Sequence, residues 1–421
     1  MSGNGRRGTV LVIGGGISGL TAAVEASETG CDVVLVEKHA FLGGRVARSH
    51  QYFPKMCPPH CGLEITLRRV KANPHIRYLT MAEVQAIRGT PGDYHATIRQ
   101  RPRGVTERCT ACGACVDACP VERPDDFNLG LTTTKAIYLP YEMAFPLRFT
   151  IDPAVCPGAS CGKCVPACPF DAIDLAATET TVEIAAQAVI VTTGWDPYDA
   201  SRIQGLGFGA HPDVITNVMM ERLATRSGPT GGKIVRLSNR EPVRSVAFVQ
   251  CAGSRDENYL RHCSGVCCLA SLKQARYVRA QYPEAEIYVF YIDIRAPGRL
   301  EDFFTATQAD ERLHLVKGKV ARVAEDPATH ALVVEAEDTL SGTRVAQVVD
   351  LVVLATGMVP ADTSGIAVDG GLQADAHGFL TKEQPQGGVL VAGCAARPTD
   401  VATCVRDATG AVMKALAFCG E

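Results

Sequence analysis

Two runs of regularly spaced cysteines constrain this chain more than any other feature of its sequence. The first run, 109-CTACGACVDACP-120, has the spacing C-x2-C-x2-C-x3-C-P, and the second, 161-CGKCVPACP-169, repeats the last part of it. Three thiolates on one tight loop can face one four-iron cube, whereas a fourth cysteine followed by proline usually serves another cube. The chain from about residue 105 to residue 178 is therefore predicted to fold around two 4Fe–4S clusters.

The two runs are predicted to exchange their last cysteines, because Cys119 and Cys168 are each followed by proline. Cys156 is expected to lead the second run, with four residues rather than two between it and Cys161. The predicted ligands of one cluster are Cys109, Cys112, Cys115 and Cys168, and those of the other are Cys156, Cys161, Cys164 and Cys119. This pattern resembles bacterial ferredoxin. A pair of zinc knuckles is the alternative, but zinc needs only two C-x2-C pairs.

The overall composition excludes several classes of protein. The 421 residues carry a net charge of −3, whereas a nucleic-acid-binding surface needs clustered excess lysine and arginine. No apolar run reaches the ~18 residues of a membrane span, and the first residues lack the apolar core of a signal peptide. We therefore expect a cytoplasmic protein that binds no nucleic acid. In a reducing cytosol, 18 cysteines indicate metal or redox chemistry rather than structural disulfides.

A second motif, 9-TVLVIGGGISGL-20, joins a β-branched run, a glycine turn and a helical pattern. Its glycines have the G-x-G-x-x-G spacing that brings a pyrophosphate to a helix N-terminus. Glu37 ends the next predicted strand, near the place where an acid binds a ribose hydroxyl. Together with 42-LGGR-45, the pattern resembles the FAD sites of two-dinucleotide-fold flavoproteins, with NAD as the alternative. The candidate FAD-binding residues here are Gly14, Gly16, Ile17, Ser18, Gly19, Glu37, Lys38, Gly43, Gly44 and Arg45.

Later segments resemble the remaining parts of such a flavin domain. The runs 188-AVIVTTGW-195 and 350-DLVVLATGMVP-360 each end a predicted strand with a Thr-Gly turn, and residues 388–415 form a closing strand–turn–helix pattern. In that superfamily an aspartate usually follows the glycine of the closing turn, whereas here a cysteine follows it. The candidate FAD-binding residues that these segments add are Thr193, Gly194, Gly357, Gly393 and Cys394.

The second half is predicted to keep a dinucleotide-type fold without a nicotinamide ligand, because no G-x-G-x-x-G follows the strand-like run 245-SVAFVQCAGSRDE-257. Four cysteines stand here among polar neighbours, which favours a functional cluster over a buried core. The motifs C-A-G-S-R and H-C-S-G-V-C-C resemble those of the heterodisulfide reductase A-subunit family. That resemblance implies a further iron–sulfur cluster near the flavin, with the candidate ligands Cys251, Cys263, Cys267 and Cys268. Because the last two are adjacent, an atypical cluster and a redox dithiol are the alternatives.

Cys57 and Cys61 form another group, set among prolines after the FAD motif. A metal-ligand pair, a redox or partner-facing role beside the flavin, and a proline-stiffened loop all remain open. The surrounding 52-YFPKMCPPHCGLEI-65 and the later 138-YLPYEMAFP-146 resemble the A subunit of the quinone-interacting membrane-bound oxidoreductase, within the same family.

The resemblance implies a role in dissimilatory sulfur metabolism, passing electrons between adenylylsulfate reductase and the membrane quinone pool. It also implies two partners, namely a membrane cytochrome or iron–sulfur subunit and a second heterodisulfide reductase A-like flavoprotein subunit. The chain would then reach the inner face of the membrane only through its complex. The alternatives are a heterodisulfide reductase-like subunit with electron bifurcation or thiol chemistry, an NAD(P)H-dependent reductase resembling the glutamate synthase small subunit, and a non-enzymatic scaffold.

The expected fold class is α/β, a thioredoxin reductase-like flavoprotein with two dinucleotide-binding domains and an inserted α+β bacterial ferredoxin-like module. The predicted segments are a first FAD-domain part at 1–104, the ferredoxin-like insertion at 105–178, an FAD-domain return and linker at 179–240, the second dinucleotide-type domain at 241–345, and the last FAD-domain part at 346–421.

Overall fold

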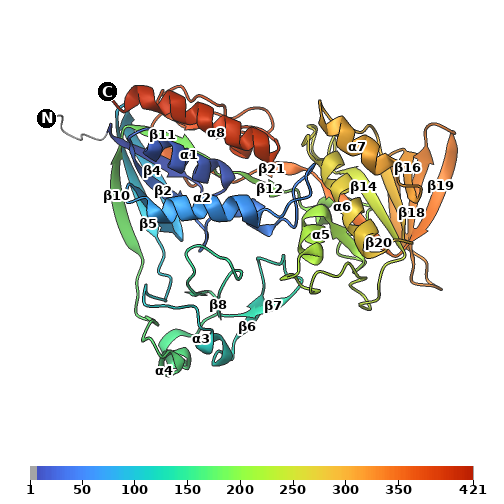
Figure 1. The fold of residues 1–421 in the computed structure, drawn as a ribbon, viewed down its shortest axis with the longest axis horizontal. Helices are drawn as coiled ribbons and strands as arrows, with labels where there is room; N and C mark the ends of the chain where they lie inside the picture. Colours follow the sequence, from blue (N-terminus) through green and yellow to red (C-terminus); the bar gives the residue numbers. More distant parts are fainter. Residues whose placement is uncertain (1–6, 421) are drawn as a thin grey trace.

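The computed structural model describes residues 7–420, and its first layer is a five-stranded parallel sheet in the order β23-β11-β1-β2-β3. The β1 residues Val10 and Val12 pack under the helices, whereas Leu11 and Ile13 pack on a second sheet, because successive side chains alternate between faces. The strands are β1 (Thr9–Ile13), β2 (Asp32–Glu37), β3 (Ile76–Thr80), β11 (Ala188–Val191) and β23 (Val389–Val391). The covering helices are α1 (Ile17–Glu28), α2 (His60–Ala72) and α8 (Val401–Ala415) (Figure 1).

The other face of this sheet carries a four-stranded sheet in the order β10-β5-β4-β22. Its strands are β4 (Ala82–Thr90), β5 (Asp93–Gln100), β10 (Thr180–Ala186) and β22 (Ala367–Val368). Because β10 pairs antiparallel with β5 over its whole length, the chain leaves and re-enters this sheet at adjacent positions. Residues 101–179 thus form a true insertion in the flavin domain.

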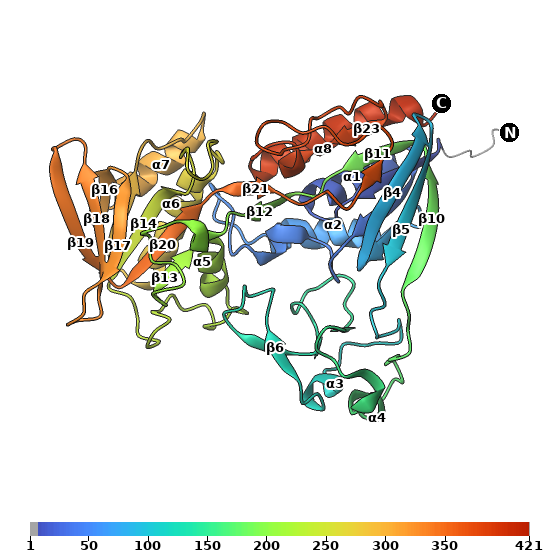
Figure 2. The same cartoon turned by 180° about the vertical axis from the view of Figure 1, so that it is seen from behind.

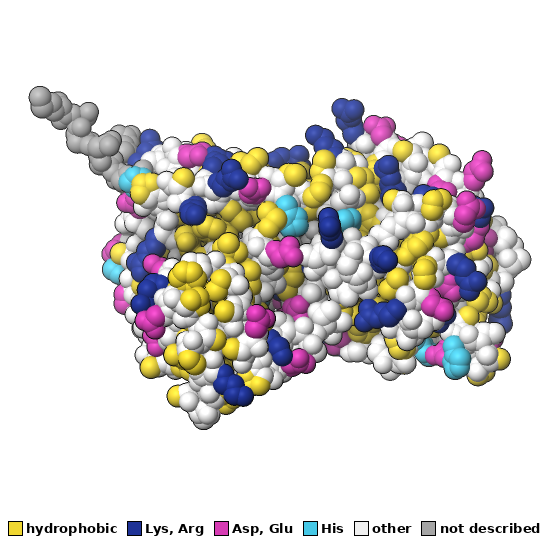
Figure 3. Space-filling view, turned by 60° about the horizontal axis from the view of Figure 1, so that its bottom comes forward, with side chains coloured by type: hydrophobic (Ala, Val, Ile, Leu, Met, Phe, Trp, Pro, Cys, Tyr) yellow, Lys and Arg dark blue, Asp and Glu magenta, His cyan; other side chains and the backbone are white. Residues whose placement is uncertain are grey.

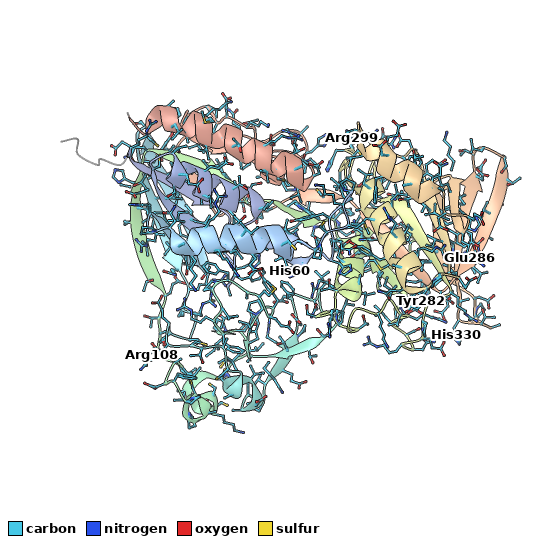
Figure 4. The ribbon with its side chains drawn as sticks, viewed as in Figure 1. His60, Arg108, Tyr282, Glu286, Arg299 and His330 are labelled. Atoms are coloured by element: carbon cyan, nitrogen blue, oxygen red, sulfur yellow. The ribbon has the colours of Figure 1, made fainter. Side chains whose placement is uncertain are left out.

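The insertion extends away from both sheets and ends in two short helices at its tip (Figure 2). These are α3 (Ala114–Asp117) and α4 (Cys164–Ala167), which pack against each other above a small core of Val105, Ile137 and Phe149. Two small hairpins support them: β6 (Glu122–Pro124) with β7 (Thr133–Lys135), and β8 (Ile137–Tyr138) with β9 (Thr150–Ile151). His60 opens α2 on the side that faces the insertion, which carries Arg108 (Figure 4).

The second half is built on another five-stranded parallel sheet, in the order β13-β20-β14-β15-β16. Its strands are β13 (Val214–Thr216), β14 (Ser245–Ala252), β15 (Glu286–Tyr291), β16 (Leu313–Lys317) and β20 (Leu351–Thr356). The helices are α5 (Asn217–Ala224), α6 (Cys267–Gln281) and α7 (Leu300–Gln308). An antiparallel sheet of β17 (Val320–Glu325), β18 (Leu332–Asp338) and β19 (Thr343–Val349) completes this half.

The strand at 351–356 lies in a different domain from the one predicted for it. The sequence assigns this segment to the last FAD-domain part, but β20 pairs with β13 and β14 in the second sheet. The physical reason is that strands buried on both faces of parallel sheets have the same continuous apolar pattern, so the pattern does not identify the sheet. The two halves are joined by the ribbon of β12 (Trp195–Pro197) and β21 (Met358–Pro360). Within residues 7–420, no helix is long and apolar enough to cross a membrane.

Candidate flavin cavity and cysteine sites

A cavity of about 1140 Å³ runs from the carboxyl edge of the first sheet towards the second half. Ligands of doubly wound folds bind at this edge of the sheet. Its walls include the glycine turn with Gly14 and Gly16, the insertion with Phe127 and Tyr138, and the first turns of α6 with Ala270. The insertion and the second half therefore both border the candidate flavin site.

The glycine turn has room for a pyrophosphate because its residues carry no Cβ atoms. A Cβ on Gly14, whose φ is +106°, would lie 2.4 Å from the carbonyl oxygen of Thr192. A Cβ on Gly19 would lie 1.8 Å from the carbonyl oxygen of Gly14, which shows how closely α1 packs on β1. A Cβ on Gly16 would meet nothing within 4 Å, so this position faces the open cavity at the N-terminus of α1.

Glu37 lies at the end of β2, buried against the same turn and lining the cavity. Its Oε2 accepts the Gly15 N–H at 2.7 Å, and its Oε1 accepts the His39 N–H at 2.8 Å. Burial raises the pKa of Glu37, although these two hydrogen bonds oppose the rise. Burial also lowers the pKa of His39 to about 4, so this imidazole is neutral beside the cavity.

Arg45 connects the FAD motif to the ribbon between the two halves. It ion-pairs with Asp196, donates from Nε to the carbonyl oxygen of Trp195, and its guanidinium lies 4.8 Å from the Trp195 ring centroid. It follows Gly44 in η1 (Gly44–Arg48), a 3-10 helix that begins at the L-G-G-R turn. Burial lowers the pKa of Arg45, and the Asp196 carboxylate opposes that change.

Most predicted FAD-binding residues line the cavity. They are Gly14, Gly16, Ile17, Ser18, Glu37, Lys38, Gly44, Arg45, Thr193, Gly194 and Cys394. Gly19, Gly43 and Gly393 are not among the lining residues and instead allow close packing around the cavity. Gly357 is a predicted FAD-binding residue, but it does not line the cavity. A Cβ there would lie 2.3 Å from Ser254 Oγ, so this glycine packs on the second half.

The sequence does not single out several residues of the cavity wall. Thr399 and Asp400 line it, and Asp400 Oδ1 accepts the Thr403 N–H at 2.7 Å and caps α8. An aspartate before a helical pattern is a recognisable N-cap signal. Cys404 and Lys273 also line the cavity, but both are brought there by tertiary packing alone. Of the proline-set pair, Cys57 lines the cavity and Cys61 does not, although both are exposed.

The structure brings together the first predicted set of cluster ligands. Cys109, Cys112, Cys115 and Cys168 line one small hollow at the tip of the insertion. Burial, followed by the negative charges of Cys109, Cys168 and Cys112, raises the pKa of Cys115 to about 12. Neighbouring thiolates repel one another, and bound iron offsets this repulsion because its positive charge balances theirs. This arrangement therefore fits a cluster.

The second predicted set also converges. Burial is the main cause of the raised pKa of Cys164, and the negative charges of Cys156, Cys119 and Cys161 raise it as well. Backbone N–H groups of Gly158 and Ala111 point at the sulfurs of Cys156 and Cys109 at 3.5 and 3.4 Å. Such N–H···S contacts tune iron–sulfur clusters. Within residues 7–420, no three His, Cys, Asp or Glu side chains are arranged closely enough to hold a metal ion.

The third group of cysteines lies at the carboxyl end of β14, where it meets the start of α6. Cys251 lies at the end of the strand with φ +55°, and Cys267 and Cys268 open the helix. Burial raises the pKa of Cys251 to about 11, with Cys268 and Cys263 adding to the rise and Arg255 opposing it. The four predicted sulfurs are thus electrostatic neighbours of one another.

The loop between β14 and α6 is longer than the glycine turn of the first fold, and its residues are closely packed. In the first fold, three residues separate β1 from α1, whereas here residues 253–266 separate β14 from α6. A Cβ on Gly253 would lie 2.8 Å from Ile203 Cδ1, and Ser264 Oγ accepts the Met358 N–H at 2.7 Å. This turn therefore differs from the short glycine turn that binds a pyrophosphate in such folds.

Comparisons with known proteins agree with this arrangement. Residues 12–77 match the NAD(P)-binding Rossmann-like domain, and residues 104–122 and 153–171 each match the 4Fe-4S binding domain. These matches support FAD and two 4Fe–4S clusters as the cofactors. The chain also resembles T. acidophilum thioredoxin reductase (TM-score 0.52, 14% identity, 97% of this chain and 98% of that one). A Lactococcus lactis thioredoxin reductase gives a TM-score of 0.52 at 13% identity over 98% and 99%, so the predicted fold is confirmed.

Several curated relatives that match nearly the whole chain are A subunits of heterodisulfide reductases. The second iron–sulfur A subunit of the CoB–CoM heterodisulfide reductase of Methanopyrus kandleri is 38% identical over 96% of this chain and 63% of its own length. The corresponding protein of Methanocaldococcus jannaschii is 37% identical over 95% and 63%. The A subunit of the H(2):CoB-CoM heterodisulfide,ferredoxin reductase of Methanothermobacter marburgensis is 36% identical over 96% and 63%. The chain thus spans less than two thirds of the length of these relatives.

Proposed function

Because this chain belongs to the heterodisulfide reductase A-subunit family, we propose that it passes electrons between adenylylsulfate reductase and the membrane quinone pool, within a larger complex. The family assignment makes it a flavin and 4Fe–4S electron-transfer oxidoreductase. The choice of adenylylsulfate reductase and quinone as the two terminal carriers rests on the loops at 52–65 and 138–146. These loops resemble the A subunit of the quinone-interacting complex. The chain would lie in the cytoplasm, at the inner face of the membrane through its partners.

The observation that carries an electron-relay function is the shared cavity. The FAD turn, the cluster-bearing insertion and the N-terminal turns of α6 all contribute to its walls. Val266, which precedes the cluster candidate Cys267, is one of the lining residues. FAD supplies the exchange between two-electron and one-electron carriers, and the protein supplies its position. A flavin held here would be bordered by the cluster-bearing insertion and by the residue that precedes Cys267.

The electron donor and acceptor are proposed to be proteins rather than a nicotinamide nucleotide. The packed loop at 253–266 supports this proposal, because it leaves no glycine turn open at the second sheet. The insertion also exposes large apolar side chains on its surface (Figure 3). They are Met143, Leu147, Val155, Val165 and Phe170. Exposed apolar patches near a redox centre suit contact with a partner protein.

The four cysteines at the start of α6 are proposed to hold a further iron–sulfur cluster. Their convergence and the Gly265 N–H···Sγ contact with Cys263 at 3.3 Å support a cluster. Iron analysis of anaerobically purified protein distinguishes the alternatives: about 8 iron atoms per chain are expected from two four-iron clusters, and about 12 with a third. An iron content near 8 that Cys251→Ser leaves unchanged would favour the redox dithiol.

Native purification with identification of the accompanying subunits tests the proposed complex. We expect a membrane cytochrome or iron–sulfur subunit together with a second flavoprotein of the same family, and the purified complex should reduce a quinone analogue with electrons from adenylylsulfate reductase. A hydrogenase or formate dehydrogenase in the same complex would contradict the quinone role.

A heterodisulfide reductase-like role, with electron bifurcation or thiol chemistry, is the second candidate. The names of the relatives favour it, since those proteins are called CoB–CoM heterodisulfide reductases. It predicts that the complex reduces a heterodisulfide and accepts electrons from hydrogen or formate through a partner subunit. Turnover of a heterodisulfide without any quinone reduction would select this role.

A further inference from the structure

Two buried thiols meet at the edge of the flavin cavity. The Sγ atoms of Cys394 and Cys404 lie 3.7 Å apart, and their side chains are 7% and 5% exposed. Both residues line the cavity, so the little surface that they expose faces it. Neither belongs to the three cysteine groups that the clusters use.

Local structure holds the two thiols at this separation. Gly393, with φ +67°, begins η4 (Gly393–Ala395), and a Cβ there would lie 2.2 Å from Ser18 Oγ and 3.3 Å from Cys404 Sγ. Only glycine therefore lets the turn approach α8 this closely. Cys404 lies one turn into α8, where its N–H donates to the Asp400 carbonyl oxygen at 2.9 Å. Both backbones are thus fixed by regular structure.

The surroundings favour sulfur chemistry over metal binding. The pair packs in a small apolar cluster with Met358, Trp195 and Val266. Among residues 7–420 there is no third His, Cys, Asp or Glu side chain that would complete a metal site with these thiols. Two neighbouring thiols without a metal can be oxidised to a disulfide.

We propose that Cys394 and Cys404 are a modification site that closes to a disulfide by exchange with a low-molecular-weight disulfide entering the flavin cavity. Closure brings the sulfurs from 3.7 Å to about 2.05 Å. This inference concerns the chain's own thiols and does not depend on the identity of its electron partners.

Cys404 is the attacking sulfur and Cys394 the resolving one. Cys394 Sγ lies 3.4 Å from the Thr399 carbonyl oxygen and can donate its proton there, which leaves Cys404 as the sulfur that ionises. Contact with Cys394 lowers the pKa of Cys404. The thiolate displaces one thiol from the small disulfide and forms a mixed disulfide with the other. Cys394 then attacks Cys404 Sγ and releases the second thiol. Two protein thiols are oxidised, one small disulfide is reduced, and both protein protons leave on the two released thiols.

Occupancy of the cavity controls this exchange. Gly16, Ser18 and Cys394 line the same cavity, so FAD bound across the glycine turn blocks the approach to the pair. The disulfide is therefore expected to form in the flavin-free chain and to be suppressed in the FAD-loaded one. The pair then reports whether the chain carries its flavin under oxidising conditions.

The test treats the full chain, with its clusters and with or without FAD, anaerobically with glutathione disulfide. Remaining thiols are alkylated and the peptides are analysed by mass spectrometry. We expect a Cys394–Cys404 linked peptide, lighter by two hydrogen atoms, that forms about tenfold or more slowly with FAD bound because exchange requires access. Cys394→Ser should trap glutathione on Cys404, whereas Cys404→Ser should leave Cys394 unmodified.

Two other sites in the chain serve as controls. Cys61 is exposed and does not line the cavity, so it should carry glutathione in every sample, which shows that the reagent is active. Cys31 and Cys419 form another hydrogen-bonded, buried thiol pair that does not line the cavity, so it should stay reduced. The proposal is overturned if Cys61 is modified without a Cys394–Cys404 link. It is equally overturned if FAD gives no protection, or if the Cys31–Cys419 pair closes at the same rate.

Discussion

The buried carboxylate of Glu221 joins three parts of the molecule, and Glu221→Gln tests how strongly it does so. Its Oε1 accepts from Lys273 Nζ at 2.9 Å and from Gln274 Nε2 at 2.6 Å. Its Oε2 accepts from the His50 N–H at 2.9 Å and from the Tyr277 hydroxyl at 3.2 Å. These partners belong to α6 and to the loop that follows η1 beside the flavin cavity.

The cost of the substitution comes mainly from the lysine that loses its counter-ion. The side chains of Lys273 and Glu221 are only 7% and 9% exposed. Removing one partner of a buried ion pair costs about 3–5 kcal/mol. Because Lys273 Nζ keeps the Gln51 carbonyl oxygen at 2.7 Å, we expect the lower end of this range. About 3 kcal/mol corresponds to a fall in Tm of roughly 6–12 °C for a domain of this size.

The effect should also depend on pH. Burial acts to raise the pKa of Glu221, but Lys273 and the hydrogen bonds outweigh it, so the folded-state pKa lies below the ordinary value of 4.5. A depressed carboxyl pKa stabilises the fold above the unfolded-state pKa and loses that contribution as pH falls through the folded-state pKa. The difference in Tm between wild type and Glu221→Gln should have its full size at pH 7 and become smaller as the pH falls below 4.5.

Thermal unfolding of the anaerobic FAD-loaded protein, followed at pH 7 and at lower pH, measures both effects. Glu64→Gln is the matched control, because Glu64 pairs with Arg68 on the exposed face of α2. Exposed pairs contribute little, so its Tm should stay within about 1 °C of wild type. A Tm of Glu221→Gln equally close to wild type at pH 7 would refute the reasoning, as would a difference that does not shrink in acid.

Two further predictions concern the cofactor sites. Gly16→Ala should leave the Tm of the flavin-free chain unchanged but weaken FAD binding about tenfold or more, because its Cβ enters the open cavity. Gly19→Ala should instead lower the Tm of the flavin-free chain, because its Cβ meets the Gly14 carbonyl oxygen. FAD titration and thermal unfolding separate these outcomes. Cys164→Ser and Cys168→Ser should each remove about four iron atoms per chain, and the double variant about eight, because the two residues serve different clusters. A loss of only four from the double variant would disprove the exchanged ligand sets.

Local spacing was sufficient to predict which cysteines of the insertion lie together and where the glycine turn lies. The cysteine runs specify both sets because most ligands of each cluster come from one short loop. The same holds for Gly14 and Glu37, which one β-α-β unit brings together. Where a motif is contained in one supersecondary unit, its spacing in the chain already describes its geometry.

Tertiary packing accounts for what the sequence could not predict. Charged residues within helices usually face solvent, so nothing marks the contact between Glu221 on α5 and Lys273 on α6. Cys404 falls on the buried stripe of α8, where a cysteine reads as a small hydrophobic residue. Gly357 resembles a flavin-domain glycine, yet its strand lies in the second sheet because parallel strands share one apolar pattern.

Anaerobic reduction by NADH and NADPH tests the central claim most directly, namely that this chain exchanges electrons with protein carriers and not with a nicotinamide nucleotide. The closed loop between β14 and α6 is the feature under test. Stopped-flow absorbance of the FAD-loaded protein should show no bleaching of the flavin with either nucleotide, whereas a one-electron donor such as reduced methyl viologen should bleach both flavin and cluster bands. Rapid, stoichiometric bleaching of the flavin by NADH or NADPH would contradict the account.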